Sequence, residues 1–330
     1  MHVYFAAVKT EAAKSFCIFL ATIFWVSLVC FLNNKEVYPK GRFCRPANFH
    51  HRCLPLLSET VILGQKEDKG YFGPNKLYLI DATEAACGTS VRYNGTISLP
   101  TIALLSSPGS GNTWLRWLIE RLTGICTGSV YSDPTVKRAG FQCEDSQVRQ
   151  GAIVYKTHSL QLLNATALIL LIRNPFHAIP AEFHRLLTRN QTGHTTFDSF
   201  ATKRFRNTIR EWMWSWVDNS LGALRTAERL LVIFYEDLLP PGKLEHQLHR
   251  IAEFLHVRTN HNRIRCVMKN SQGPVKRRHD AVTSTGTSLT KIFPDNELTV
   301  ISVITKSVKE TFWRAGISNF PNYDDLGNIK

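Results

Sequence analysis

The sequence has few acidic residues and lacks the marks of a disordered or repetitive protein. Asp and Glu number 26 against 40 Lys and Arg, which leaves a formal net charge of +14 at pH 7. This excess suits an acidic partner such as a nucleotide, an acidic glycan, a nucleic acid or a membrane surface, and it does not choose among them. No low-complexity tract and no internal repeat occurs, and 44% of the residues are hydrophobic. The chain is therefore not largely disordered.

Three chemical signatures are also missing. No CxxC pair and no Cys/His spacing indicates a zinc site, so we expect no metal. No recognised nucleic-acid-binding motif accompanies the basic charge, so we expect no nucleic-acid partner. The lysine that a Walker A loop carries after its last glycine is absent, because Asn112 stands there. This argues against a P-loop kinase, which we keep as an alternative.

One long uncharged segment is present near the N-terminus. Residues 15–32 read SFCIFLATIFWVSLVCFL, a run close to the lower limit for a membrane-spanning helix. The run is longer than a typical signal-peptide core, and no small-x-small cleavage pattern closes it. We therefore predict an uncleaved transmembrane signal-anchor, with a cleaved signal peptide and a buried helix as the alternatives. Residues 1–14 would then be a cytoplasmic tail, 33–98 a stem and N-terminal extension, and 99–330 one large domain.

Cysteines and glycosylation sequons follow this segment. An even number of cysteines beyond a membrane anchor suits disulfide bonds, and we predict the local pairs Cys44–Cys53 and Cys126–Cys143. The other two are Cys87 and Cys266. N-x-[ST] sequons begin at Asn94, Asn164 and Asn190. Together they predict that the large domain lies on the lumenal side.

The large domain alternates short apolar runs with segments of helical periodicity. We predict strands at 102–105, 152–155, 168–172 and 230–234, and helices at 114–122, 175–187, 197–229, 243–255 and 296–313. Gly124 stands where the first helix should end. Strands that alternate with helices predict an α/β fold, with a P-loop-like parallel sheet flanked by helices on both faces.

A glycine-rich loop, SSPGSGNT, joins the first predicted strand to the first helix. Backbone N–H groups at a helix N-terminus favour a phosphate, and Gly109 and Gly111 would let the backbone approach it closely. Ser110 and Thr113 add hydroxyl donors. The motifs YKTH, LLIRNP and FYEDL end the other three predicted strands. Because ligands of an open α/β sheet bind at the carboxyl ends of its strands, we expect the four motifs to form one site.

Together these motifs resemble the sulfotransferases that use 3′-phosphoadenosine 5′-phosphosulfate (PAPS) as the sulfuryl donor. The resemblance spans residues 99–312 and is closest to the WSC-domain-containing, sialate O-sulfotransferase-like members, through SSPGSGNTWLRWL, KTH, LLIRNP and FYEDL. Vertebrate members carry extra Cys-rich modules, for which residues 33–98 are too short, so the chain resembles the short invertebrate-type form. The resemblance implies a Golgi type II membrane sulfotransferase that acts on a hydroxyl of a glycan or glycoprotein, such as sialic acid or another sugar.

The resemblance also implies roles for individual residues. The residues that would bind the 5′-phosphosulfate are Gly109, Ser110, Gly111, Asn112 and Thr113. Arg173 would bind the 3′-phosphate, where a guanidinium suits bidentate recognition. Lys276 and Arg277 would belong to a loop that closes over the same phosphate, or else to a solvated turn or glycan-binding patch. His158 would be the general base on the acceptor hydroxyl. Lys156 would offset charge on the sulfuryl group, unless it is a solvated strand-end lysine.

Two departures from the family pattern favour an alternative. The family loop often carries a cation where Gly109 stands, so Arg116 or Lys156 would have to supply it. A family serine that contacts the 3′-phosphate is replaced by Ala181. Glu182 and His184 lie nearby and are alternative candidates for the base or for acceptor contacts, unless they and His177 simply line the helix surface. The alternative function is a noncatalytic relative that binds the product nucleotide PAP or acidic glycans.

Overall fold

A computed structural model describes residues 42–44, 53–55, 80–83, 87–94, 98–144, 151–165, 167–275 and 289–323. The chain divides into two compact units, Met1–Thr60 and Val61–Lys330. The predicted tail and anchor at residues 1–14 and 15–32 lie outside the described residues. Within the described ranges, none of the helices combines the length and apolar character needed to span a bilayer.

The described part of the first unit is one antiparallel strand pair. β1 (Arg42–Cys44) pairs with β2 (Cys53–Pro55), and the register places Cys44 opposite Cys53. Directly opposite positions are the closest approach that two strands offer. The register therefore supports the predicted pairing of these two cysteines, which stays a prediction.

The centre of the second unit is a five-stranded, entirely parallel sheet. Its strands are β4 (Ile102–Ser106), β5 (Gly128–Ser129), β6 (Tyr155–Thr157), β7 (Ala167–Ile172) and β8 (Arg229–Phe234), in the order β5-β6-β4-β7-β8. Every residue of β4 and β7 is buried, as expected where helices cover both faces. This confirms the predicted α/β class with a parallel sheet.

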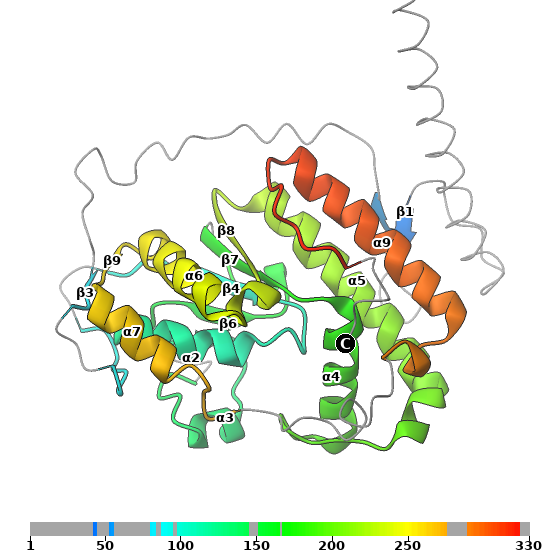
Figure 1. The fold of residues 1–330 in the computed structure, drawn as a ribbon, viewed down its shortest axis with the longest axis horizontal. Coiled ribbons are helices and arrows are strands. Elements are labelled where there is room, and N and C mark those ends of the chain that lie inside the picture. The colour runs from blue at the N-terminus through cyan, green and yellow to red at the C-terminus, as the bar shows by residue number, and fades with distance from the viewer. Residues whose placement is uncertain are drawn as a thin grey trace, which may run out of the picture. The chain divides into compact units, whose positions relative to one another are not determined.

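Helices flank the sheet in two groups (Figure 1). The first group packs together and consists of α2 (Asn112–Thr123), α6 (Pro241–Phe254) and α7 (His261–Lys269). The second consists of α4 (Pro175–Thr188), α5 (Lys203–Thr226) and α9 (Asp295–Arg314). Smaller elements complete the unit: the parallel pair β3 (Ile80–Asp81) and β9 (Val257–Arg258), the short helix α3 (Pro134–Arg138), and 3₁₀ turns at Leu160–Leu162, Phe197–Ala201, Tyr235–Leu238 and Leu289–Ile292.

The two helices that follow β4 and β7 form where their sequences predict. Leu115, Leu118 and Leu122 of α2 are fully buried, and Gly124 ends the helix at φ 72° with its N–H bonded to the carbonyl of Glu120. α4 begins at a proline, and the side chain of Asn174 accepts a hydrogen bond from the N–H of Phe176. Both helices therefore start directly at the carboxyl edge of the sheet.

The order of the strands places the topological switch point of the sheet at the carboxyl end of β4. After β4 the chain forms β5 and β6 on one side, and then crosses to β7 and β8 on the other. Such a reversal of strand order leaves room between the connections that leave the sheet on either side. The loop after β4 lies at this switch point.

Two disulfide bonds occur in the second unit. Cys126–Cys143 confirms one predicted local pair. Cys87–Cys266 joins the segment before β4 to α7, across a sequence separation of 179 residues. Spacing alone gives no indication of the second bond.

Candidate functional site

The loop between β4 and α2 forms a cradle of unsatisfied donors. The first bond of α2 runs from the N–H of Leu115 to the carbonyl of Gly111, so the amides of the residues just before Leu115 have no partner within the helix. The hydroxyls of Ser107 and Ser110 are buried and have no hydrogen-bond partner among the described residues. Buried polar groups without partners are rare, and they mark this loop as a place for a polar ligand.

Close packing explains why both of these loop positions are occupied by glycine. Gly109 and Gly111 have φ of 79° and 90°, a conformation that side chains rarely adopt. A Cβ atom on Gly111 would lie 2.6 Å from the ring of Tyr235. A Cβ atom on Gly109 would strike the carbonyl of Ala178 and lie 3.0 Å from the nitrogen of Glu182. The loop is therefore held between α4 and Tyr235.

The side chain of Asn112 turns into the protein. Its Nδ2 donates to the carbonyl of Leu104 at 3.1 Å and to the hydroxyl of Ser106 at 3.0 Å. The amide side chain thus ties the start of α2 to the end of β4, and the backbone N–H of Asn112 is what it can offer a ligand. Thr113 is half-buried at the next position.

Arg173 lies against the loop. Its Nη1 donates to the carbonyl of Gly109 at 2.8 Å, and its guanidinium stacks on the ring of Tyr235, 4.2 Å from the ring centre. Its Nε is buried and has no partner among the described residues. The structure therefore brings together two motifs that lie more than sixty residues apart, as predicted for a shared site.

A half-buried carboxylate, that of Glu236, supports the segment that carries Arg173. Glu236 accepts the N–H of Asn174 at 2.9 Å through one oxygen and the hydroxyl of Tyr323 at 2.6 Å through the other. Burial, together with the negative charge of Glu236, raises the pKa of Tyr323 well above its usual value, so the phenol remains a donor. Tyr323, in the C-terminal part of the described chain, thus helps to fix the segment after β7 through Glu236.

His158 follows β6 and is held in one tautomer. Its Nδ1 lies 2.7 Å from the carbonyl oxygen of Ser106, which can only accept, so Nδ1 carries the proton. The imidazole stacks on the ring of Tyr131, with 5.4 Å between ring centres. The hydroxyl of Tyr131 accepts the backbone N–H of His158, and Asn219 donates to its carbonyl. The lone pair of Nε2 is left to accept a proton from a ligand.

Burial, with two nearby positive charges, keeps this histidine neutral. Burial, followed by the charges of Lys156 and Arg185, lowers the pKa of His158 to about 3. Lys156 is only 7% exposed on β6, which excludes a solvated strand-end lysine. Burial, followed by the charge of Arg116, lowers its pKa to about 8, and its ammonium makes no hydrogen bond to another described residue.

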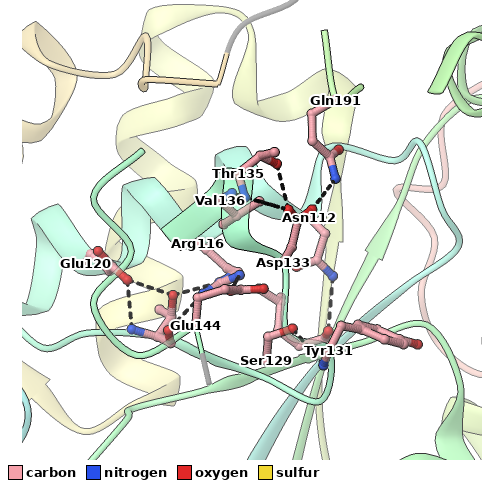
Figure 2. Close-up of polar contacts among 12 residues, drawn as sticks. Asn112, Arg116, Glu120, Ser129, Tyr131, Asp133, Thr135, Val136, Glu144 and Gln191 are labelled. Atoms are coloured by element: carbon pink, nitrogen blue, oxygen red, sulfur yellow. Dashed lines mark hydrogen bonds and ion pairs between the residues drawn. The ribbon is translucent and has the colours of Figure 1, made fainter. Parts of the chain in front are cut away.

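Arg116 is not available to the loop. It was one of the two residues that we expected to supply the positive charge missing at Gly109, and this expectation is wrong. Figure 2 shows Arg116 directed from α2 toward Glu144, with which it forms a fully buried ion pair. Its Nε and Nη2 donate to the hydroxyl and the carbonyl of Thr127, both at 2.8 Å. Glu120 accepts the N–H and the hydroxyl of the same threonine. The guanidinium is therefore occupied by structural contacts.

The residues of α4 do not simply line a helix surface. Glu182 and His184 are buried, at 5% and 2% exposure, and His177 is half-buried. Burial, followed by the charge of Arg173, lowers the pKa of His177 to about 4. Ala181 lies on the same helix. Glu182 binds Arg185 through two hydrogen bonds of 2.7 and 2.5 Å. The sequence gives no sign of this pair beyond its i,i+3 spacing.

No protein-family model matches the chain. The "WSCD family member GA21586" of Drosophila pseudoobscura pseudoobscura is 30% identical over 279 residues, which cover 78% of this chain and 85% of the relative. The chain belongs to the WSCD family. The "WSCD family member CG9164" of Drosophila melanogaster is 29% identical over the same shares of the two chains. The "WSCD family member AAEL009094" of Aedes aegypti is 34% identical over 53% of this chain and 56% of its own.

These relatives confirm the resemblance of this WSCD family member to the WSC-domain-containing group. Among solved structures, mouse sulfotransferase SULT7A1 in complex with PAP aligns with a TM-score of 0.43 and 16% identity, over 70% of this chain and 89% of that one.

Two sets of predicted residues of the WSCD family member remain, the basic pair and the sequon asparagines. Lys276 and Arg277 are outside the described residues. The chain that leads to them is fixed to α2, because Trp114 donates to the carbonyl of Ser271 at 2.6 Å and Trp117 donates to that of Asn270 at 2.9 Å. The three sequon asparagines are all exposed: Asn94, Asn164 and Asn190. In the part of the chain that the structure describes, no group of three or more His, Cys, Asp or Glu is placed to hold a metal ion.

Proposed function

We propose that this WSCD family member transfers a sulfuryl group from PAPS to a hydroxyl of a glycan. One observation supports this above the others. A loop with buried, unpaired donors and a neutral histidine with a free Nε2 meet at one edge of a parallel sheet. The loop offers hydrogen-bond donors and His158 offers a base, so this arrangement does not require the metal-assisted acyl or phosphoryl chemistry of other sites.

The loop and Arg173 fit the donor nucleotide. The backbone amides at the start of α2, with the hydroxyls of Ser107 and Ser110, would hold the 5′-phosphosulfate. The unpaired Nε of Arg173 would bind a phosphate beside the loop. The assignment of Lys276 and Arg277 to the 3′-phosphate rests on the motif resemblance alone. These contacts explain why polar atoms are left unpaired in a buried place.

The chemistry that follows is a single displacement at sulfur. When bound, PAPS supplies a sulfur atom that the acceptor oxygen attacks, while the bond to the bridging oxygen breaks and its electron pair stays on the leaving phosphate. Nε2 of His158 takes the proton of the acceptor hydroxyl, since Nδ1–H is bound to Ser106. Lys156 lies on β6, two residues before His158, and its ammonium offsets negative charge.

We also propose that the domain faces the Golgi lumen on a type II membrane anchor. The uncharged segment at 15–32, the two disulfides and the three exposed sequon asparagines support this location. Glycosidase treatment of the full chain from a eukaryotic host should lower its apparent mass, and protease added to intact microsomes should leave the domain uncut. An unchanged mass together with cleavage would contradict the lumenal location.

A thermal-shift titration of the full chain in detergent tests the donor site. A ligand that binds only the folded state stabilises it by about 2.7 kcal/mol at 100 times its dissociation constant. We expect stabilisation by PAP and PAPS and little by ATP–Mg²⁺. Turnover is then measured with radiolabelled PAPS and a glycoprotein mixture, with label on the glycan as the expected result.

The alternative is a noncatalytic relative that binds PAP or acidic glycans. It is favoured by the absence of any cationic side chain in the loop between β4 and α2. Stabilisation by PAP without transfer to any acceptor would support this alternative. Selective stabilisation by ATP–Mg²⁺ would instead favour a kinase.

A further inference from the structure

The loop between β4 and α2 has no cation, and the structure explains why. A Cβ atom at Gly109 would meet the backbone of α4, at the carbonyl of Ala178 and at the nitrogen and Cβ of Glu182. Any side chain at this position would therefore start against α4. The oxygens of the sulfuryl group carry negative charge during transfer, and a preorganised positive group beside them lowers the barrier. Such a group must therefore come from another element.

The cations already described do not fully meet this need. The guanidinium of Arg116 is buried against Glu144 and Thr127. Arg173 is bound to the carbonyl of Gly109. Lys156 is close to the reacting histidine, but burial lowers its pKa to about 8, so its charge weakens just above neutral pH.

Arg185 carries a permanent charge and is held by a residue that packs against the loop. Glu182, whose backbone packs on Gly109, grips Nε and Nη2 of Arg185 through its two carboxylate oxygens at 2.7 and 2.5 Å. The side chain of Glu182 is 6% exposed, whereas that of Arg185 is 38% exposed. Nη1 of Arg185 forms no hydrogen bond to another described residue. The guanidinium is thus fixed on its inner side and open on its outer side.

The charge of Arg185 acts on the reacting groups. It lowers the pKa of both His158 and Lys156, the two residues at the end of β6 that the proposed transfer uses. Asp133, the other charged group that acts on Arg185 besides Glu182, is itself engaged by Thr135, Val136 and Gln191 (Figure 2). No described carboxylate other than these two contributes to the pKa of Arg185.

We propose that Arg185, held by Glu182, supplies the positive charge that the loop cannot carry and binds the sulfuryl group of PAPS during transfer. This rests on the proposed sulfotransferase function. Arg185 is then a catalytic residue and Glu182 is a positioning residue that links it to Gly109.

The test compares PAPS with PAP, which has the same nucleotide and lacks the sulfuryl group. Loss of a charge-assisted contact in Arg185→Gln should weaken PAPS binding by about 10-fold to 100-fold and change PAP binding by less than about 2-fold. Arg185→Lys should recover part of the PAPS affinity and of kcat. Arg225→Gln, which removes an exposed arginine from the end of α5, is the matched control and should bind both ligands as the wild type does.

A pH profile gives a second readout that a structural role would not move. Since the charge of Arg185 lowers the pKa of His158, its removal should shift the acidic limb of kcat/KM to higher pH. Lys156 and Arg185 are the charged groups that act on this imidazole, so the Arg225 control should leave the limb in place.

Each outcome separates this inference from the function on which it rests. Equal loss of PAP and PAPS affinity in Arg185→Gln, or no loss of either, would overturn the role of Arg185 while leaving the donor site intact. If the wild-type protein binds neither nucleotide, the proposed function fails and this inference fails with it. A selective loss of PAPS binding, with partial recovery in Arg185→Lys, supports it.

Discussion

Nδ1 of His158 lies 2.7 Å from the carbonyl oxygen of Ser106, the last residue of β4. This bond joins two neighbouring strands at the carboxyl edge of the sheet and selects the tautomer in which Nε2 is unprotonated. The same serine ends the strand that leads into the glycine-rich loop. The position of the proposed base and the position of the loop therefore both depend on one residue.

His158→Ala should remove transfer and leave nucleotide binding almost unchanged. General base catalysis contributes about 10²-fold to 10⁴-fold, so kcat should fall by that range while the PAP affinity stays within about 2-fold. Steady-state rates with radiolabelled PAPS and PAP titrations measure the two effects. His249→Ala, at an exposed position of α6, is the control. A His158 variant with the wild-type rate would place the base elsewhere.

The rate of the wild-type protein should stay insensitive to mild acid. The pKa of His158 is lowered to about 3, so the base is unprotonated well below its ordinary value of 6.5. We expect kcat/KM to hold its neutral value down to about pH 5, where a free imidazole would be mostly protonated. An acidic limb close to pH 6.5 would show that the imidazole is not shielded in solution.

Lys156→Met should make the protein more stable and less active. At neutral pH the folded state holds a buried ammonium whose pKa has fallen from 10.5 to about 8, a cost of about 3 kcal/mol. Between these values the unfolded chain binds more protons, so wild-type stability rises with pH through that window. The gain from the substitution should be largest below about pH 8 and shrink toward pH 10.5, as urea unfolding at several pH values would show. A destabilised variant at pH 7 would contradict this.

Gly109→Ala should cost more stability than the matched change Gly140→Ala. Both glycines have positive φ, at 79° and 104°, so both substitutions strain the backbone by about 1 kcal/mol. A Cβ atom at Gly140 meets no atom within 4 Å, whereas one at Gly109 meets the backbone of α4. Urea unfolding should show an extra loss for Gly109→Ala, together with weaker PAP binding. Equal losses of stability in the two variants would mean that α4 shifts to accommodate the added methyl group without destabilising the protein.

Arg173→Lys should weaken PAP binding nearly as much as Arg173→Ala. A lysine cannot donate to the carbonyl of Gly109 and stack on Tyr235 while it also holds a phosphate. We expect a loss of about 10-fold or more, since a hydrogen bond to a charged group contributes about 1.5–3 kcal/mol. Calorimetry measures it, with the exposed Arg204→Ala as control. Unchanged affinity in both variants would remove Arg173 from the donor site.

The two disulfides should differ in their effect on stability. The chain-entropy relation gives about 3 kcal/mol for the short loop closed by Cys126–Cys143 and about 5 kcal/mol for the long loop closed by Cys87–Cys266. Paired Cys→Ser variants, compared by urea unfolding, should lose stability in that order. The reverse order would indicate residual structure in the unfolded chain around residues 87–266.

Helices with clear apolar spacing and recognisable end residues were predicted well from the sequence. The apolar spacing and terminal glycine of α2 gave its position within two residues, and α9 was predicted at 296–313 against the observed Asp295–Arg314. The strand predicted at 152–155 was shifted, because Ala152 to Val154 are buried without belonging to the ladder, which begins at Tyr155. α7 was missed, since its polar sequence has a buried face of only a few residues.

The motifs of the candidate site could be predicted from the sequence, but the residues that hold these motifs in place could not. Strand ends of a parallel sheet must meet, so the loop, His158 and Arg173 could be grouped from sequence. The pair of Glu182 and Arg185 could not, because its relevance depends on the packing of α4 against Gly109, a tertiary contact. The same holds for Tyr323, which reaches Glu236 across 87 residues of sequence.

The contact between Gly109 and α4 has a consequence for how the family can vary. A relative that carries a side chain at this loop position must also move or reshape α4 near Ala178 and Glu182. The loop and the helix are therefore expected to change together during evolution, and a loop transplanted alone between distant members should fail to fold correctly. Chimeras between family members should therefore exchange the loop and α4 together, as one block.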